Sequence, residues 1–438
     1  MTDLSELEHT NSYYAATQRD KGIFPTFEGT VHTDICIIGG GLTGVATAVE
    51  LGEYGQDVVL LEGRRIGWGA SGRNGGQIIG GYGEALSIDP ARTQAHFGAE
   101  AVDDLNRMSV ECVDIIRDRV AKYNIQCDLR WGYLDVARNR REMRGIAKMF
   151  ANYQGASYPH EIRLLDRGEL RDYLGTGSYV GGMANTGYGH LHVLDLCKAE
   201  ARIAESLGAR IFEQSLVTSL TRGAKIRIHT GQGTVIADRV VLAGNGYLSQ
   251  LAPEVAPELT RYVLPATSYV IATEPLGEDL ARSVMQKNFA TCDQRTALDY
   301  FRLSADNRML FGGLCNYSAR DPRSITGTMV KRMKSVFPQL SDVMIDYHWG
   351  GHMGIGLNRI PQLGLLDENI FYAQAYSGHG VAPTHMSGRI LAEALVGDAR
   401  RLELMAGVAH KPFPGGRMLR HALFATGMAY YKLKDELV

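Results

Sequence analysis

The chain has 438 residues, 45% of them hydrophobic and 21% charged, which is typical of soluble globular proteins and enough for two domains. A formal net charge of −2 and the lack of a basic stripe argue against a nucleic-acid partner. No apolar run approaches the roughly 18 residues of a membrane span, and no signal peptide is recognised, so we expect a cytoplasmic protein.

The first predicted elements form a strand–helix–strand unit. Residues 33–38 contain an apolar run that enters three glycines, which predicts a buried strand. Residues 42–54 carry apolar side chains at helical spacing, and Gly55 ends this helix. Residues 58–61 are a second buried strand. Such a βαβ unit implies a parallel sheet with a right-handed crossover.

Further elements alternate along the rest of the chain. Helices are predicted over 93–122, 140–153 and 194–207, and short strands over 210–212, 217–220, 226–229 and 239–243. Residues 265–273 and 298–313 alternate in polarity like strands of an antiparallel sheet. A last strand over 370–373 enters Ser377-Gly378-His379-Gly380, and a helix with Met386 and Leu395 on its apolar face follows.

The glycines after the first strand match a dinucleotide-binding pattern. Gly39, Gly41 and Gly44 occupy the three positions of G-x-G-x-x-G, which provide a tight turn, close approach of a pyrophosphate, and close helix–strand packing. The helix N-terminus behind them offers free N–H groups to phosphates. Glu62, at the end of the second strand, is placed to accept hydrogen bonds from ribose hydroxyls and would repel the 2′-phosphate of NADP. The alternative is a glycine-rich turn with a surface glutamate.

A second glycine-rich loop distinguishes FAD from NAD. Residues 67–77 form a long glycine-rich run, with hydrogen-bonding groups on Ser71, Arg73, Asn74 and Gln77. They follow the strand expected to bind adenosine directly. An extended FAD needs a second cradle for its pyrophosphate and flavin ring, whereas a simple NAD dehydrogenase does not. The alternative is a surface loop of small residues.

These motifs resemble the D-amino-acid-oxidase/glycine-oxidase superfamily of FAD-dependent oxidoreductases. Within it, the bacterial gamma-glutamylputrescine oxidoreductases and gamma-glutamylpolyamine oxidases are the most similar, and shared segments run almost end to end. They include Ser12-Tyr13-Tyr14-Ala15-Ala16, Gly189-His190-Leu191-His192 and the run from Leu298 to Arg308.

The resemblance implies an α/β fold. An FAD-binding Rossmann-like βαβ domain would be interleaved with an antiparallel-sheet α+β substrate domain, as in D-amino-acid and glycine oxidases. The FAD-binding domain would take residues 1–90, 160–262 and 346–438, and the substrate-binding domain residues 91–159 and 263–345. In this arrangement the antiparallel sheet forms a roof over the flavin.

The motifs and the resemblance together define an expected set of cofactor-binding residues. The set comprises Gly39, Gly41, Leu42, Thr43, Gly44, Glu62, Gly63, Arg64, Gly69, Ala70, Ser71, Arg73, Asn74, Gly75, Gly76, Gln77, Val217, Ala243, Gly244, Asn245, Arg359, Gly378, His379, Gly380 and Val381. His379 either faces the flavin or satisfies its own turn. Asn74 stands where a histidine-linked relative carries its histidine, so we expect non-covalent FAD. No metal is expected, because no C-x-x-C pair or metal-ligand spacing is present.

The source of electrons is predicted from an absence in the sequence. No second G-x-G-x-x-G follows a strand, so a bound substrate and not NAD(P)H should reduce the flavin. The resemblance implies an amine substrate. A hydride would leave the carbon beside a neutral nitrogen, and water would hydrolyse the resulting imine. We expect oxygen or another acceptor to take the electrons.

The resemblance also directs attention to substrate-side residues. Tyr300, Arg302, His352 and Tyr376 are the expected catalytic or substrate-contacting residues, and Trp349 is a further candidate. Tyr300 and Arg302 should share one face of a strand. Arg302 would bind a carboxylate or form a structural ion pair with Asp299 or Asp306. His352 replaces an asparagine expected in the most similar relatives, which leaves the identity of the amine open.

The function implied is oxidation of the terminal amine of a gamma-glutamylated polyamine in polyamine catabolism. The products would be an aldehyde, ammonia and, with oxygen as acceptor, hydrogen peroxide. One alternative is a glycine or D-amino-acid oxidase or dehydrogenase. An alternative of another class is a flavin-binding protein without catalytic activity.

Overall fold

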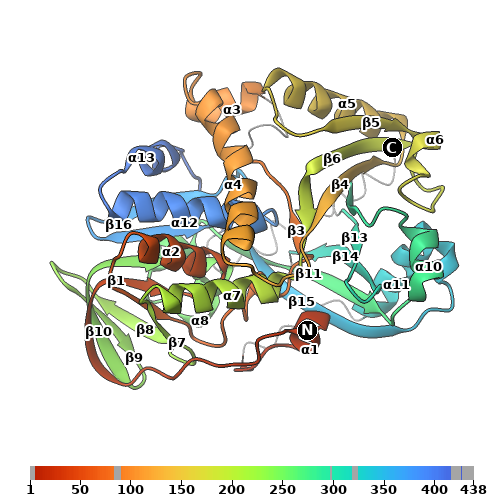
Figure 1. Cartoon of the computed structure of the whole chain (residues 1–438). Helices are drawn as coiled ribbons and strands as arrows, with labels where there is room; N and C mark the ends of the chain where they lie inside the picture. The colour runs from red at the N-terminus through yellow and green to blue at the C-terminus, as the bar shows by residue number, and fades with distance from the viewer. Residues whose placement is uncertain (1–4, 83–89, 296–297, 318–323, 416–425, 427–438) are drawn as a thin grey trace.

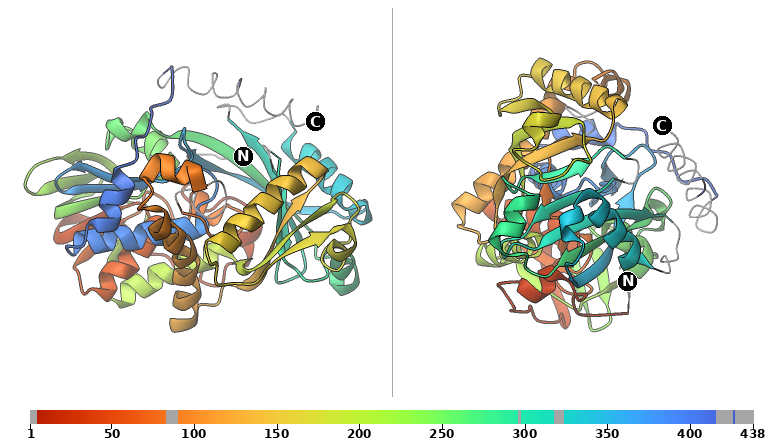
Figure 2. Two further views of the ribbon diagram at one scale, coloured as in Figure 1. Left: turned by 90° about the horizontal axis from the view of Figure 1, so that it is seen from above. Right: turned by 90° about the vertical axis from the view of Figure 1, so that its right-hand side faces the viewer.

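The computed structural model describes residues 5–82, 90–295, 298–317, 324–415 and 426. These residues form two sheets: a mostly parallel sheet at the left of Figure 1 and a mostly antiparallel sheet at the right. The left view of Figure 2 shows the two sheets toward opposite ends of the molecule. Throughout this described part, each helix is too short or too polar to cross a membrane.

The first sheet is built around parallel strands, of which β1, β2 and β10 are buried toward their carboxyl ends. Its hydrogen-bonded order is β16-β17-β10-β1-β2-β7, with a β8–β9 hairpin beside β10. The parallel strands are β1 (Gly29–Ile38), β2 (Val58–Leu61), β7 (Arg210–Phe212), β10 (Gly233–Leu242) and β17 (Ile370–Gln374). The antiparallel strands are β8 (Val217–Thr221), β9 (Ile226–Thr230) and β16 (Gln362–Asp367). Parallel strands end at a common edge, so their carboxyl ends converge on one place.

The second sheet is antiparallel except for the pair of β12 and β4. Its order is β15-β11-β14-β13-β12-β4-β6-β3, and β5 pairs with β6. Its strands are β3 (Gln77–Ile78), β4 (Arg130–Ala137), β5 (Ile162–Asp166), β6 (Gly181–His190), β11 (Leu264–Thr273), β12 (Ala290–Asp293), β13 (Tyr300–Leu303), β14 (Met309–Asn316) and β15 (Ile345–Ile355). We call this the roof sheet.

Helices cover both sheets. We group the helices by the segment of chain to which they belong. Those in the segments that also carry the first sheet are α1 (Tyr13–Thr17), α2 (Leu42–Glu53), α7 (Val193–Ser206), α8 (Asn245–Leu251), α9 (Pro257–Thr260), α12 (Val381–Leu395) and α13 (Arg400–Ala406). The others are α3 (Pro90–Phe97), α4 (Val102–Lys122), α5 (Arg140–Gly155), α6 (Arg167–Leu170), α10 (Gly277–Val284) and α11 (Ile325–Val336). In Figure 1, α2, α7 and α12 lie over the parallel sheet.

A buried ionic network joins four of these helices. Arg119 of α4 lies 2.5 Å from Glu50 of α2 and 2.9 Å from Glu200 of α7. The ring of His385 on α12 also contacts Glu200, at 3.0 Å. All four side chains are buried, so the charges of Arg119, Glu50 and Glu200 depend on their partners for compensation. The network holds the helix layer in one arrangement over the sheet.

The structure confirms the predicted βαβ unit and refines several element boundaries. The helix expected over 93–122 is two helices, α3 and α4, because Gly98 adopts a φ of +87° between them. The alternating stretch 298–313 is the two strands β13 and β14, which a tight turn separates. The strand expected over 239–243 is the second half of β10.

Some residues that the sequence analysis places in the FAD-binding domain form strands of the roof sheet. Residues 160–190 and 346–355 were assigned to the FAD-binding segments, whereas β5, β6 and β15 hydrogen-bond within the roof sheet. Parts of the expected segments, at 1–4, 83–89 and 427–438 among others, lie outside the described residues. The precise domain boundaries therefore stay a prediction.

Close packing of α2 on β1 depends on two glycines. Gly39 turns the chain with a φ of +115°, which side chains other than glycine rarely tolerate. A Cβ atom on Gly44 would lie 1.9 Å from the Gly39 carbonyl oxygen. Helix α2 can start directly at the end of β1 only because neither position carries a side chain.

This contact generates a stability prediction. Gly44→Ala should lower the free energy of unfolding by roughly 1–3 kcal/mol or more, because the new methyl group overlaps backbone that cannot move aside. Gly145→Ala is the matched control: Gly145 is exposed within α5, and its Cβ would meet nothing within 4 Å. The control should gain roughly 0.5–1 kcal/mol. Chemical unfolding of both variants checks this, and equal stabilities would contradict the packing argument.

Candidate active site

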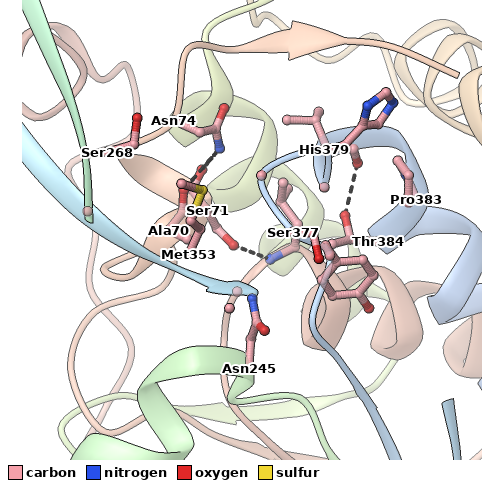
Figure 3. A pocket seen from close by; sticks show the side chains of 18 of the residues that line it. Ala70, Ser71, Asn74, Asn245, Ser268, Met353, Ser377, His379, Pro383 and Thr384 are labelled. Atoms are coloured by element: carbon pink, nitrogen blue, oxygen red, sulfur yellow. Dashed lines mark hydrogen bonds between the residues drawn. The ribbon is translucent and has the colours of Figure 1, made fainter. Parts of the chain in front are cut away.

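One cavity of about 690 Å³ runs between the two sheets. Its lining includes residues at the ends of β1, β2 and β10 and residues of the roof sheet. In Figure 3, Ala70, Ser71 and Asn74 lie on one side of this pocket, and Ser377, His379, Pro383 and Thr384 lie on the other. The carboxyl edge of a parallel sheet is where ligands of such folds bind.

The glycine loop after β1 is held from two directions. The N–H of Leu42, at the start of α2, donates to Ser71 Oγ at 2.8 Å. Glu62 Oε2 accepts from the Gly40 N–H at 2.6 Å, and Oε1 accepts from the Arg64 N–H at 2.8 Å. Burial raises the pKa of Glu62. Both carboxylate oxygens therefore brace the backbone, and each keeps a lone pair for a further donor.

The second loop wraps around its own polar side chains. Arg73 is buried, lies over the Trp68 ring at 4.4 Å, and donates through Nε to the Trp68 carbonyl oxygen at 2.7 Å. The amide of Asn74 donates to Ala70 O at 3.0 Å, and its oxygen accepts from the Gly76 N–H at 2.8 Å. Gln77 reaches across to the Thr291 carbonyl oxygen of the roof sheet at 3.2 Å. These bonds fix the loop as a preformed wall.

The residues present fit an anionic dinucleotide. Among the described residues, Nη2 of Arg73 has no hydrogen-bond partner although it is buried, and Arg73 lines the cavity. A buried cation with an unused donor suits a phosphate. The helix N-terminus at Leu42 and the side-chain-free positions Gly39 and Gly41 lie on the same wall. The glycine turn at the start of α2 and the positive charge of Arg73 therefore both match the expected FAD.

Two later turns close the same cavity. Asn245, after β10, accepts the Ala375 N–H at 2.9 Å and so ties this turn to the one after β17. Gly378 has a φ of +88°, and Gly380 caps the N-terminus of α12. His379 lines the cavity while its Nε2 lies 2.9 Å from the Gly80 carbonyl oxygen. Its ring thus fastens the α12 turn to the segment behind the second loop.

The structure brings most of the expected cofactor residues together. Those lining the cavity are Gly39, Gly41, Leu42, Thr43, Glu62, Gly63, Gly69, Ala70, Ser71, Arg73, Asn74, Gly75, Gln77, Val217, Ala243, Gly244, Asn245, Arg359, Gly378, His379, Gly380 and Val381. Gly44, Arg64 and Gly76 stand behind this lining. Gly44 packs α2 on β1, and Arg64 and Gly76 donate backbone N–H groups to Glu62 and Asn74.

Two of the expected substrate-side residues face the cavity. Tyr300 packs its ring over Gly75, and its hydroxyl lies 3.3 Å from Ser268 Oγ. The hydroxyl of Tyr376 accepts from Thr43 Oγ1 at 3.0 Å and so touches the start of α2. Burial raises the pKa of Tyr376 to about 12 and that of Tyr300 further, so both phenols stay neutral near pH 7. Both act as neutral walls and hydrogen-bonding groups.

Arg302 faces the same Gly75–Gly76 turn as Tyr300, as the strand pattern predicts, but it does not line the cavity. Its Nε donates to Gly75 O at 2.8 Å, and its Nη2 donates to Leu191 O at 2.8 Å and to Tyr14 Oη at 3.0 Å. The expected partners Asp299 and Asp306 pair with other arginines. The guanidinium thus ties three distant segments together.

His352 and Trp349 also stand outside the cavity lining. The His352 ring lies 3.0 Å from Thr267 Oγ1 and packs against Tyr247. Trp349 is buried, and its indole N–H donates to the Arg73 carbonyl oxygen at 2.9 Å. Each supports a neighbouring wall instead of facing the cavity.

Sequence reasoning missed the part of the cavity beneath the roof sheet. Side chains of β4, α5, β6 and the β12 region line it, and they are Tyr133, Asp135, Met149, Tyr153, Tyr188, Cys292, Asp293, Gln294, Arg295 and Leu298. The strands β4 and β6 carry glycines and polar residues without a clear alternation, so no pattern marked them. A lone aspartate between apolar residues of β4 was the available signal.

The comparisons with known proteins agree with this geometry. The family described as FAD dependent oxidoreductase (DAO) matches residues 34–394. The chain is 42% identical to gamma-glutamylputrescine oxidoreductase of Escherichia coli (strain K12), over 98% of this chain and 99% of that protein. It is 39% identical to the probable oxidoreductase OrdL of Haemophilus influenzae, over the full length of both. The crystal structure of glycine oxidase from Geobacillus kaustophilus matches with a TM-score of 0.71 at 20% identity, covering 84% of this chain and 95% of that one.

The bracing role of Glu62 generates a binding prediction. Glu62→Gln should weaken FAD binding roughly ten- to hundredfold, because one amide oxygen cannot accept from both Gly40 and Arg64 and the new NH₂ group opposes one of them. Titration of the cofactor-free protein with FAD measures the dissociation constant. Glu161→Gln, at an exposed position, is the control for loss of one charge. An unchanged dissociation constant in Glu62→Gln would overturn the assignment.

The position of Arg302 generates a second prediction. Arg302→Lys should lower the free energy of unfolding by roughly 1–3 kcal/mol, because a single ammonium cannot serve Gly75, Leu191 and Tyr14 together. The KM for an amine substrate should change little. Chemical unfolding and steady-state kinetics of the variant check this prediction. A raised KM with an unchanged free energy of unfolding would contradict it and would indicate that Arg302 contacts the substrate.

Proposed function

The chain belongs to the family of FAD-dependent oxidoreductases, and from that premise we propose that it oxidises the terminal amine of a gamma-glutamylated polyamine. The products are an aldehyde, ammonia and, with oxygen as acceptor, hydrogen peroxide. The 42% identity to gamma-glutamylputrescine oxidoreductase over almost the whole chain supports this choice among amine substrates.

One observation carries the proposal: the cavity continues well beyond Tyr300. Tyr300, Cys292 and Asp135 are register partners on adjacent strands of the roof sheet, and all three line the cavity. Two interstrand spacings separate the first from the last, which is roughly 10 Å. A long, extended amine fills such a space, whereas glycine or D-alanine would leave most of it empty.

The surroundings of Arg302 argue against the amino-acid alternative. An amino acid carries its carboxylate on the carbon that is oxidised, so its site needs a cation close to the cofactor. Arg302 was the candidate for that cation, and its donors are taken by backbone carbonyl oxygens and Tyr14. Arg295, further along the cavity, is paired with Asp293 and Asp299.

FAD, when bound, would supply the hydride acceptor. The chain's own residues position the amine and exclude water. Tyr300, over Gly75, walls the cavity beside the second loop. The first N–H groups of α12, behind Gly380, would offer positive partial charge to a bound flavin. Correct placement of a neutral amine is the main requirement of this chemistry.

We also propose that FAD is held without a covalent bond. Asn74, which stands where a histidine-linked relative would carry its histidine, uses its amide and its oxygen within its own loop. The retention of FAD then rests on the glycine cradle, Glu62 and Arg73.

A comparison of substrates tests the proposal. With gamma-glutamylputrescine the protein should release peroxide, ammonia and aldehyde in equal amounts when oxygen is the acceptor. Its kcat/KM should exceed that for glycine or D-alanine by roughly a hundredfold or more, because the short substrates leave the distant part of the cavity unused. Faster turnover of the amino acids would favour the amino-acid-oxidase alternative. Failure of every amine to reduce the flavin would favour a non-catalytic flavin protein.

A further inference from the structure

The carboxylate of Asp135 faces the cavity beneath the roof sheet. Asp135 lies near the end of β4, a strand visible at the upper right of Figure 1, and lines the cavity beside Cys292 of β12. Register partners on neighbouring strands point to the same face of a sheet. Asp135 therefore ends the row that starts at Tyr300, on the face that looks into the cavity.

This carboxylate differs from the acidic groups nearby because no basic side chain among the described residues forms an ion pair with it. Asp293 contacts Arg295 at 2.8 Å, and Asp299 contacts Arg332 at 2.7 Å. Within the described part of the chain, Asp135 makes no salt bridge, and its recorded hydrogen bond comes from Gln294 Nε2 at 3.1 Å. Burial raises its pKa to about 7. A bound cation would relieve the cost of an ionised carboxylate in these surroundings.

The walls around Asp135 suit an aliphatic chain. Tyr133 lies on the same strand and face, Tyr153 and Met149 come from α5, and Tyr188 comes from β6. The hydroxyls of Tyr153 and Tyr188 lie 2.8 Å apart and bond to each other, which leaves the ring surfaces as the wall. Aromatic faces pack well against methylene groups and attract cations. A largely aromatic wall thus surrounds a carboxylate that no protein cation among the described residues neutralises.

The distance along the row limits what Asp135 can do. The backbone positions of Tyr300 and Asp135 are two interstrand spacings apart, roughly 10 Å. A general base must lie within hydrogen-bonding reach of the proton that it removes, or within one water of it. Asp135 is too far along the row to deprotonate an amine reacting beside Tyr300. It is well placed to hold a second charge on the same molecule.

We propose that Asp135 is a specificity-determining residue that binds a second ammonium group of the substrate, roughly 10 Å from the carbon that is oxidised. This inference rests on the proposed function, since it takes the amine-oxidising site beside Tyr300 as its starting point. It deepens that function by naming the substrate class: an extended amine with two cationic nitrogens at a fixed separation. Gln294 orients the carboxylate through its amide.

A matched pair of substrates tests the inference. Gamma-glutamylputrescine and glutarylputrescine have the same chain, and only the first carries an α-ammonium. In the FAD-loaded wild-type enzyme the first should have the lower KM. In Asp135→Asn the KM for gamma-glutamylputrescine should rise roughly ten- to hundredfold, with kcat nearly unchanged and the KM for glutarylputrescine little affected. An equal rise for both substrates, or none for either, would overturn the proposal.

Two further variants separate recognition from structure. Asp135→Glu keeps the charge and should keep the preference for the α-ammonium. Glu161→Gln removes one negative charge from an exposed position next to β5 and should leave both KM values unchanged. Loss of the preference in Glu161→Gln would show that net charge, and not Asp135, sets it, which would also contradict the inference.

A binding measurement keeps this inference distinct from the proposed function. Calorimetric titration of the FAD-loaded protein with 1,8-diaminooctane, which is long enough to place one nitrogen beside Tyr300 and the other beside Asp135, should give, without oxygen, a dissociation constant roughly tenfold or more higher in Asp135→Asn than in wild type. If no amine reduces the flavin, the proposed function fails while this measurement still decides the role of Asp135. Equal binding, or no binding, to both proteins would overturn the role of Asp135 alone.

Discussion

The close approach of α2 to the end of β1 is the constraint on which the cofactor site depends. A single methyl group on Gly44 would overlap the Gly39 carbonyl oxygen, so the contact exists only without side chains. It brings the positive end of α2 to the carboxyl edge of the sheet. Ser71 then caps that helix end from the second loop, and Glu62 braces the turn from the next strand. These three interactions assemble one wall.

The two sheets contribute different kinds of recognition. The parallel sheet presents backbone groups and short side chains, which suit a pyrophosphate and a ribose. The roof sheet presents a row of larger side chains, from Tyr300 through Cys292 to Asp135, which suits a flexible amine. In the proposed function, the glycine cradle, Glu62 and Arg73 hold FAD, and side chains of the roof sheet hold the amine.

Local patterns predicted one part of the cofactor half, and the family resemblance supplied the rest, including Val217 and Arg359. The run from Gly39 to Gly44 and the loop from Gly69 to Gln77 could be recognised because the spacing of their glycines is visible in the sequence. Arg302 shows where this fails: its partners at Gly75, Leu191 and Tyr14 lie more than a hundred residues away, and the sequence does not display them. The roof strands β4 and β6 were missed because glycines and polar residues break their alternation. Asp135 could not be recognised as a cavity residue, because the sequence does not show how β4 pairs with its neighbouring strands.

Reduction of the bound FAD in the absence of oxygen tests the central claim most directly, namely that one cavity holds both FAD and the amine that reduces it. The purified protein is mixed with gamma-glutamylputrescine, and in parallel with NADH and NADPH, while the visible absorbance of the flavin is followed. The account predicts rapid and complete bleaching by the amine and none by either nicotinamide on the same timescale. Bleaching by a nicotinamide, with none by the amine, would contradict it.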